Sequence, residues 1–267
     1  MKIARILAAV LLLATATALA PARATSFSTD QSDLWWNPAE SGWGIQFVHR
    51  GNIIFATMFV YDQSKVPIWY GGTMYPTGAS FTWSGSNYET SGPWFGNVPF
   101  DPAQVTNRIV GTITWVATSI TTGTLTYTVD GVQVTKLLTR QTLVYDDFSG
   151  TFQGAIHSTS SSCANPANDG TSELSAGLFV GQVNTSMSVD ISDAQGIMCN
   201  YSGNLSQAGQ MGAINGGTYS CNNGDGGSFS MFELQVNISG LTGRFARSSN
   251  LTGCSSNGWF GAMRNQP

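Results

Sequence analysis

Alternating hydrophobic and polar residues run through most of the chain and predict short β-strands. Residues 112–118 place Ile113, Trp115 and Ala117 on one face, with threonine and valine between them. Residues 124–129 repeat this alternation. A period of two is typical of a strand with one buried face, and almost no segment keeps the helical period of 3.6. The pattern therefore predicts an all-β fold.

Turn residues separate these runs at the spacing of antiparallel hairpins. Asp130-Gly131 predicts a two-residue type I′ turn, which needs positive φ at both residues. Asp101-Pro102 predicts one helical turn, because Asp caps a helix and Pro suits its first position. Residues 53–61 are apolar on both faces and predict a central strand that is covered on both sides or contacts another domain. Sequential hairpins favour two consecutive antiparallel meander barrels, calycin-like in type, with sandwiches as the alternative.

The beginning of the chain has the features of a secretory signal peptide. Lys2 and Arg5 precede an apolar run that ends in an Ala-Arg-Ala cleavage site at residues 22–24. We expect a signal peptide over residues 1–24 with cleavage near Ala24, and a product that is secreted or periplasmic. No later run approaches the ~18 apolar residues of a membrane-spanning helix, so no transmembrane segment is expected.

Charge and motifs remove several classes of function. The formal charge is −4, and loss of the leader with its three basic residues makes it about −7. Only 11 Lys and Arg occur, too few for the basic surface of a nucleic-acid-binding protein. The nucleophile elbow, the metalloprotease motif and the phosphate- and dinucleotide-binding loops are absent, so no cofactor is expected. Residues 222–227 resemble a calcium loop but lack its ligand spacing, so no metal site is expected.

Tryptophan and cysteine are divided unequally along the chain. Seven of the eight tryptophans precede residue 145, whereas all four cysteines follow residue 160. We expect a Trp-rich β domain over residues 25–146 and a Gly-, Ser- and Asn-rich, disulfide-bearing β domain over residues 147–267. Short, polar strands in the second domain bury little apolar area, so cross-links are needed there. These strands are expected at residues 187–192, 198–205, 213–221, 229–238 and 259–264.

An even number of cysteines in an exported protein predicts disulfides. Four cysteines allow three pairings. We favour Cys199 with Cys221, on successive expected strands, and Cys163 with Cys254, which ties the opening of the second half to its end. A zinc site is not expected, because there is no C-x-x-C pair and both histidines are distant from the cysteines.

An aromatic run at residues 35–43 is the main candidate for chemistry. Flat rings stack on sugars or line apolar pockets, and an eight-stranded barrel has room for one small ligand. The alternative is that these large rings pack the core. We expect a ligand-binding site at Trp35, Trp36, Glu40, Trp43 and Trp69.

These observations predict a non-catalytic binding module that recognises a glycan, a small apolar ligand or a surface partner. One alternative is a structural or adhesive surface protein. Another is a hydrolase using Glu40 or His49, although glycoside hydrolysis needs a second carboxylate about 5–9.5 Å away. His157 is a weaker catalytic candidate, because the serine-rich residues 158–162 that follow it predict a flexible loop.

The aromatic run has a recognisable sequence. Residues 35–44 read Trp-Trp-Asn-Pro-Ala-Glu-Ser-Gly-Trp-Gly, and related segments follow. Residues 33–145 resemble a β module found in many secreted bacterial proteins, alone or appended to larger enzymes. Lys65 stands where similar sequences tend to have Gly. The resemblance implies a bacterial, exported protein and carries no established activity, while the second half resembles small disulfide-bearing calycin-like barrels. The related segments are residues 52–57, 59–62, 67–69, 100–103, 123–127 and 138–141.

Overall fold

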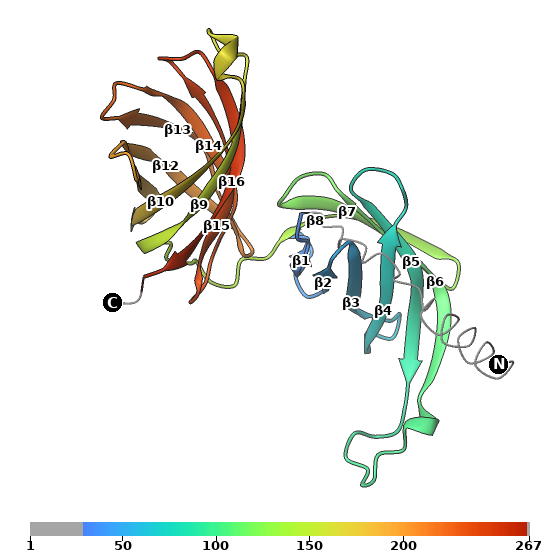
Figure 1. Cartoon of the computed structure of the whole chain (residues 1–267). Helices are drawn as coiled ribbons and strands as arrows, with labels where there is room; N and C mark the ends of the chain where they lie inside the picture. Colours follow the sequence, from blue (N-terminus) through green and yellow to red (C-terminus); the bar gives the residue numbers. More distant parts are fainter. Residues whose placement is uncertain (1–28, 266–267) are drawn as a thin grey trace, which may run out of the picture.

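The computed structural model describes residues 29–265, which form two closed, eight-stranded antiparallel barrels in consecutive halves of the chain (Figure 1). In each barrel, strands that follow one another in sequence are paired, and the last strand pairs with the first. The predicted all-β fold is confirmed, with barrels rather than sandwiches. The expected signal peptide lies outside the described residues. Among those residues, no helix has the length and apolar character needed to cross a membrane.

Two local predictions in the first barrel are confirmed. Asp130 and Gly131 connect the last two strands with φ angles of 49° and 84°, as a type I′ turn requires. The 3₁₀ helix η1 (Pro102–Gln104) begins after Asp101, whose side chain accepts a hydrogen bond from the Ala103 amide. The first barrel contains β1 (Asp33–Trp36), β2 (Gly44–Arg50), β3 (Ile53–Tyr61), β4 (Pro67–Pro76), β5 (Thr82–Ser91), β6 (Thr106–Ala117), β7 (Thr122–Val129) and β8 (Val132–Arg140).

Aromatic rings fill the interior of the first barrel. The ring centroids of Trp35 and Trp115 lie 4.6 Å apart, and that of Phe47 lies 5.0 Å from Trp115. Both indole N–H groups donate to Gln31. The Trp35 indole donates to the Gln31 carbonyl oxygen at 2.9 Å, and the Trp115 indole donates to the Gln31 side-chain oxygen at 3.1 Å. Gly123 lies under the Trp115 ring, where a Cβ would approach the ring to 2.2 Å. The barrel therefore closes around a packed aromatic core.

The outer surface of the first barrel is more apolar than predicted. Residues 53–61 form β3 between β2 and β4, as expected of a central strand. Its inward residues are buried, but Phe55 and Phe59 on the outer face are 48% and 51% exposed. The expectation that this strand is covered on both faces is therefore wrong for the described structure. A barrel wall has only one inner face, so an apolar outer face stays open to solvent.

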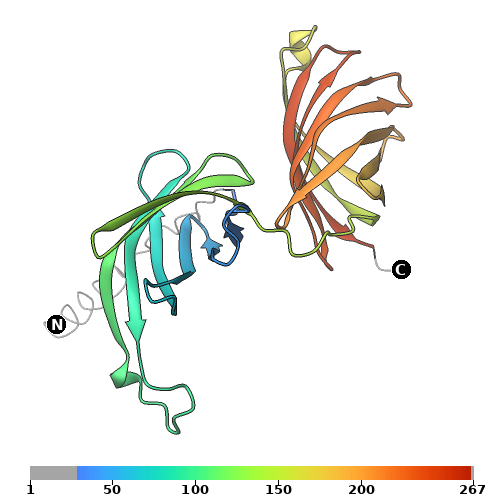
Figure 2. The ribbon, with the colours of Figure 1, turned by 180° about the vertical axis from the view of Figure 1, so that it is seen from behind.

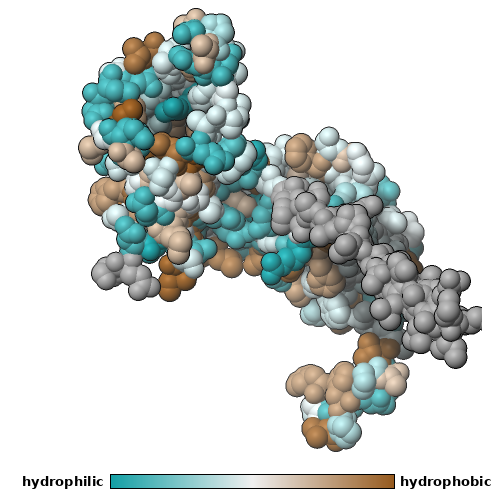
Figure 3. All heavy atoms as spheres, viewed as in Figure 1, coloured by the Kyte–Doolittle hydropathy of each residue, from teal (hydrophilic) through white to brown (hydrophobic). Residues whose placement is uncertain are grey.

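A long loop between β5 and β6 also carries apolar side chains. It extends well away from the barrel, at the bottom of Figure 1, and brown residues gather on it in Figure 3. Trp94, Phe95 and Val98 are 66%, 88% and 96% exposed there. These side chains contribute little to the core of the barrel.

The second barrel has longer strands than the sequence predicted. All five predicted strands are present with shifted ends, and three further strands, β9, β10 and β15, complete the barrel. The serine-rich residues expected to form a loop belong largely to β9, because backbone ladders require no apolar side chains. The strands are β9 (Gly150–Ser161), β10 (Gly170–Val183), β11 (Ser186–Asp193), β12 (Met198–Ala208), β13 (Met211–Cys221), β14 (Gly226–Val236), β15 (Gly240–Ser249) and β16 (Ser255–Arg264).

Both predicted disulfides are present in the second barrel. Cys199 and Cys221 face each other on the paired strands β12 and β13. Cys163 and Cys254 join residues that are 91 positions apart, next to the 3₁₀ helix η2 (Pro166–Asn168). Disulfides persist in oxidising compartments, so both bonds fit an extracellular or periplasmic protein.

The two barrels meet where the β12–β13 turn contacts β1 and the linker after β8; Figure 2 shows the linker from behind. The Gln210 amide donates to Asp33 Oδ2 at 3.0 Å, and the Gln210 side chain donates to the Ser32 carbonyl at 2.7 Å. At Gly209, where φ is 58°, a Cβ would lie 1.9 Å from Asp33 Oδ2. A side chain at this position is therefore incompatible with the observed contact.

A buried ion pair supports this junction from the first barrel. The Arg140 side chain is inaccessible to solvent and donates to Asp33 Oδ2 at 3.1 Å and to the Ile120 carbonyl at 2.7 Å. Its guanidinium lies over the Trp35 ring, 4.6 Å from the centroid. Burial lowers the pKa of Arg140, and Asp33 opposes this shift. Asp33 thus binds Arg140 and the second barrel with the same carboxylate oxygen.

Candidate ligand-binding cavity

The predicted site residues divide between the core and the surface of the first barrel. Trp35 is fully buried, so it belongs to the core and presents no surface to a ligand. Trp36, the next residue on β1, is half-buried. Adjacent residues of a strand point to opposite faces, which separates the two rings.

Glu40 and Trp43 form a local structural unit with Lys136 on β8. Glu40 Oε2 accepts a hydrogen bond from the Trp43 indole at 3.1 Å, and Lys136 Nζ donates to Glu40 Oε1 at 2.8 Å. Lys136 also lies 5.9 Å from the Trp43 ring centroid. The hydrogen bond from Lys136 holds the pKa of Glu40 below its ordinary value, against the opposing effect of burial. Such an ionised carboxylate has no proton to donate at neutral pH, which disfavours it as a general acid.

Trp69 lies on the outer face of β4 and shares a groove with Gly42, the residue before Trp43. It is 47% exposed and pairs across the sheet with Phe59 of β3. Both rings border a shallow groove of about 160 Å³. Of the five predicted site residues, Trp69 alone lines this groove. Its other lining residues are Gly42, Val60, Tyr61, Pro67 and Ile68.

The two histidines are placed by packing. His49 is buried, and its Nδ1 accepts a hydrogen bond from the Gln31 amide at 3.1 Å. Burial lowers the pKa of His49, which favours the neutral ring that this bond requires. His157 stacks on Trp259 at a centroid distance of 4.0 Å, and its Nδ1 lies 3.3 Å from Glu173 Oε1.

A cavity of about 220 Å³ lies inside the second barrel. Its polar side includes Ser158 and Ser172, whose hydroxyl groups lie 2.9 Å apart on neighbouring strands. These inward positions carry small side chains, whereas the first barrel has indole rings in its interior. Space for several water molecules is therefore left inside the closed wall. The apolar lining consists of Ile156, Leu174, Ile191, Ile197, Met231, Phe245 and Phe260.

One arginine and two tyrosines form a cluster in this barrel. Arg247 of β15 donates from Nη1 to the Tyr201 hydroxyl at 2.9 Å and lies over the Tyr219 ring, 5.5 Å from its centroid. The two tyrosine rings stack 5.0 Å apart on adjacent strands. Gly227 of β14 pairs with Tyr219, and a Cβ there would lie 1.9 Å from the Ser248 carbonyl oxygen and 3.2 Å from the Tyr219 ring, so the close approach of β15 requires glycine at this position. Arg247 and Tyr201 both line the cavity.

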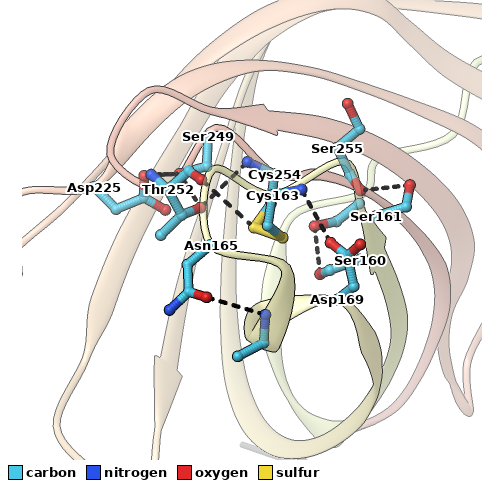
Figure 4. The surroundings of a disulfide bond; sticks show 12 residues. Ser160, Ser161, Cys163, Asn165, Asp169, Asp225, Ser249, Thr252, Cys254 and Ser255 are labelled. Atoms are coloured by element: carbon cyan, nitrogen blue, oxygen red, sulfur yellow. Dashed lines mark hydrogen bonds between the residues drawn. A yellow bond between two sulfur atoms is a disulfide. The ribbon is translucent and has the colours of Figure 1, made fainter.

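The disulfide between Cys163 and Cys254 and a network of hydrogen bonds order the end of the barrel near this cluster (Figure 4). Asp225 accepts from the Tyr219 hydroxyl at 3.1 Å and from the Ser249 hydroxyl at 2.6 Å. Thr252, two residues before Cys254, donates its amide to the same Ser249 hydroxyl at 3.0 Å. The cross-link therefore fixes the turn that positions the end of β15.

Burial raises the pKa of Tyr219 to about 12. For Arg247, burial lowers the pKa, but Tyr201, Tyr219 and Asp225 together raise it by more. At neutral pH the charged Arg247 guanidinium therefore lies over the neutral Tyr219 ring.

Sequence reasoning missed this cavity because it did not predict β15. The usable signal is the alternation Leu241, Gly243, Phe245, Arg247, in which an arginine continues an inward-facing apolar series. Arg244 on the same strand faces outward and is paired with Glu233. An arginine in phase with buried residues marks an unusual interior position.

Comparison of the chain with protein-family models, with curated proteins and with solved structures finds no match. The resemblance of residues 33–145 to a secreted bacterial module therefore stays a prediction. The cavity of the second barrel and the shallow groove beside Trp69 are both candidate binding sites.

Proposed function

We propose that this protein is an exported binding protein whose second barrel takes a small apolar ligand into its cavity. The observation that carries this proposal is the interior of about 220 Å³ walled mainly by apolar side chains, with a few polar groups among them. Small-molecule sites combine these features. The proposal keeps the small apolar ligand predicted from the sequence but moves its site away from residues 35–43.

The proposal is tested with the neutral, environment-sensitive dye N-phenyl-1-naphthylamine. Titration of the whole protein should give a saturable rise in dye fluorescence with one site per chain. The Leu174→Trp variant fills the cavity from β10 and should abolish that rise. The matched control is Phe179→Trp on the same strand, because Phe179 is 55% exposed and faces outward. Absence of saturable binding, or equal binding by both variants, would show that the cavity is not the site.

A second candidate function is glycan binding on the first barrel, favoured by the pairing of Trp69 with Phe59 beside the shallow groove. Exposed aromatic rings bury large flat areas against apolar faces. The test is a glycan array probed with the intact protein, Trp69→Ala and Trp94→Ala. Trp94 is 66% exposed but lies outside the groove, so its loss should leave the glycan signal intact. Equal loss in both variants, or no signal from the intact protein, argues against this surface.

A further inference from the structure

Arg247 is a charged group whose hydrogen bonding is incomplete in this structure. Among the described residues, its Nη1 donates to the Tyr201 hydroxyl, and its Nε is inaccessible to solvent and has no hydrogen-bond partner. Within residues 29–265, no carboxylate oxygen lies within 4.0 Å of this guanidinium. Arg247 is partly buried, and a charge that is withdrawn from water is normally paired, because its desolvation costs free energy.

The two carboxylates that line the cavity are already engaged by other donors. Asp225 accepts hydrogen bonds from the Tyr219 hydroxyl, the Ser249 hydroxyl and the Gly226 amide. Asp193 Oδ1 accepts from the amides of residues 195 and 197, each at 2.9 Å. Among residues 29–265, Arg247 is therefore a cavity charge without a direct carboxylate partner, and Asp225 acts on it only at longer range.

The position of Arg247 separates a polar from an apolar part of the cavity. Along β15 it lies between Phe245, which packs in the core, and Ser249, which bonds Asp225 near the disulfide. The Tyr201 hydroxyl accepts from Arg247, so its own proton is available to a further acceptor. The polar group of a ligand at this point would accept hydrogen bonds from the guanidinium and the phenol. Its apolar part would contact Phe245 and Phe260.

We propose that the cavity selects apolar ligands that carry a carboxylate, which accepts hydrogen bonds from the Arg247 guanidinium and the Tyr201 hydroxyl. This inference rests on the proposed function, because it specifies the chemistry of a ligand in the same cavity. Guanidinium pairs with carboxylate through charge-assisted bonds that are roughly twice as strong as neutral ones. The apolar chain of the ligand would extend toward Phe245 and Phe260.

The experiment compares three probes with the same eight-carbon chain, octanoate, 1-octanol and octylammonium, by calorimetric titration at neutral pH. Octanoate should bind at least tenfold more tightly than octanol, and octylammonium more weakly than both. Arg247→Met should reduce the preference for octanoate over octanol at least tenfold, and Tyr201→Phe should reduce it by a smaller factor. Arg244→Met is the matched control, because this outward arginine on β15 is 50% exposed in its side chain, and it should keep the full preference.

The outcomes separate this inference from the proposed function. Equal affinity for octanoate and octanol, or an unchanged preference in Arg247→Met, would overturn the carboxylate assignment and leave an apolar cavity. Failure of both octanoate and octanol to bind would overturn both proposals. If Arg247→Met does not fold, Arg247→Lys replaces it, because lysine keeps the charge but lacks the planar donor geometry. An unchanged preference in that variant would also count against the assignment.

Discussion

The two barrels share a strand number and a strand order but differ in what they enclose. In the first, the rings of Trp35, Trp115 and Phe47 meet in the interior. In the second, serines and aliphatic side chains at inward positions leave a cavity beside Arg247. The closed backbone wall is therefore compatible with either interior, and side-chain volume decides which one forms.

The distribution of disulfides follows the same difference. Both cross-links belong to the barrel with the cavity, whereas the barrel filled by rings has none. The second barrel has a buried core of its own, but its cavity gives up van der Waals contacts that a filled interior keeps. A disulfide can offset this loss by restricting the unfolded chain. We infer that the two disulfides add to the stability that the second barrel obtains from its own core, whereas the first barrel relies on packing alone.

The largest expected effect comes from emptying the packed barrel. Trp115→Ala should lower the free energy of unfolding of the first barrel by about 4 to 5 kcal/mol, because a large buried ring is lost and Gln31 loses a donor. Hydrogen exchange followed by mass spectrometry, peptide by peptide, should show faster exchange across β1–β8. Equal acceleration across β9–β16 would mean that the barrels unfold as one unit.

Removing the long cross-link should destabilise the second barrel and leave the first barrel unchanged. The double variant Cys163→Ser, Cys254→Ser opens a loop with a sequence separation of 91, which should cost the second barrel about 3 to 4 kcal/mol. Denaturant unfolding monitored by the same peptide-level exchange should leave β1–β8 unaffected. A loss below about 1 kcal/mol would contradict the dependence of this barrel on its cross-links.

A matched pair of leucines sharpens the contrast between full and hollow interiors. Leu125 in the first barrel is fully buried, whereas Leu174 in the second borders the cavity and is partly exposed. Leu125→Ala should cost about 3 kcal/mol and Leu174→Ala about 1 kcal/mol, because the second deletion only enlarges an existing space. The check is the midpoint of urea unfolding for each variant. Equal costs would indicate that the cavity wall is packed as tightly as the core.

The smallest expected effect is a change in how the stability of the first barrel depends on pH. Burial holds the pKa of His49 below its ordinary value of 6.5, so the folded state binds fewer protons than the unfolded state below that pH. Stability from the neutral ring is complete above about pH 6.5 and is lost as the pH falls through the lower, folded-state pKa. His49→Asn keeps an acceptor for the Gln31 amide and should weaken this loss between about pH 7 and pH 5. The melting temperature of the variant and of the intact protein, measured by calorimetry across this pH range, would show the difference. An unchanged pH dependence of the melting temperature would exclude His49 as the cause.

Local patterns in the sequence were sufficient for much of the fold. The alternation in residues 124–129 and the Asp130-Gly131 turn predict β7 and its hairpin, because strand period and turn chemistry act over a few residues. Cys199 and Cys221 were paired correctly for the same reason, since they lie on successive strands. The serine-rich end of β9 was missed because it has no apolar alternation and because serine is common in turns and loops.

The candidate site depends on long-range geometry and was harder to predict. Whether Trp35 or Trp36 faces the core is decided by the phase of β1, which its four residues do not determine. The meeting of Arg247 with Tyr201 requires the register of four neighbouring strands, from β12 to β15. Local composition does not contain that register, so the cluster emerges only when the barrel closes.

The uneven placement of tryptophan has a spectroscopic consequence. Seven of the eight indoles precede residue 145, and the remaining one, Trp259, is 53% exposed and stacks on His157 outside the cavity lining. Intrinsic emission of the protein therefore comes mainly from the first barrel. A ligand that enters the second barrel would leave that emission nearly unchanged, so a quenching screen would score a true ligand as inactive.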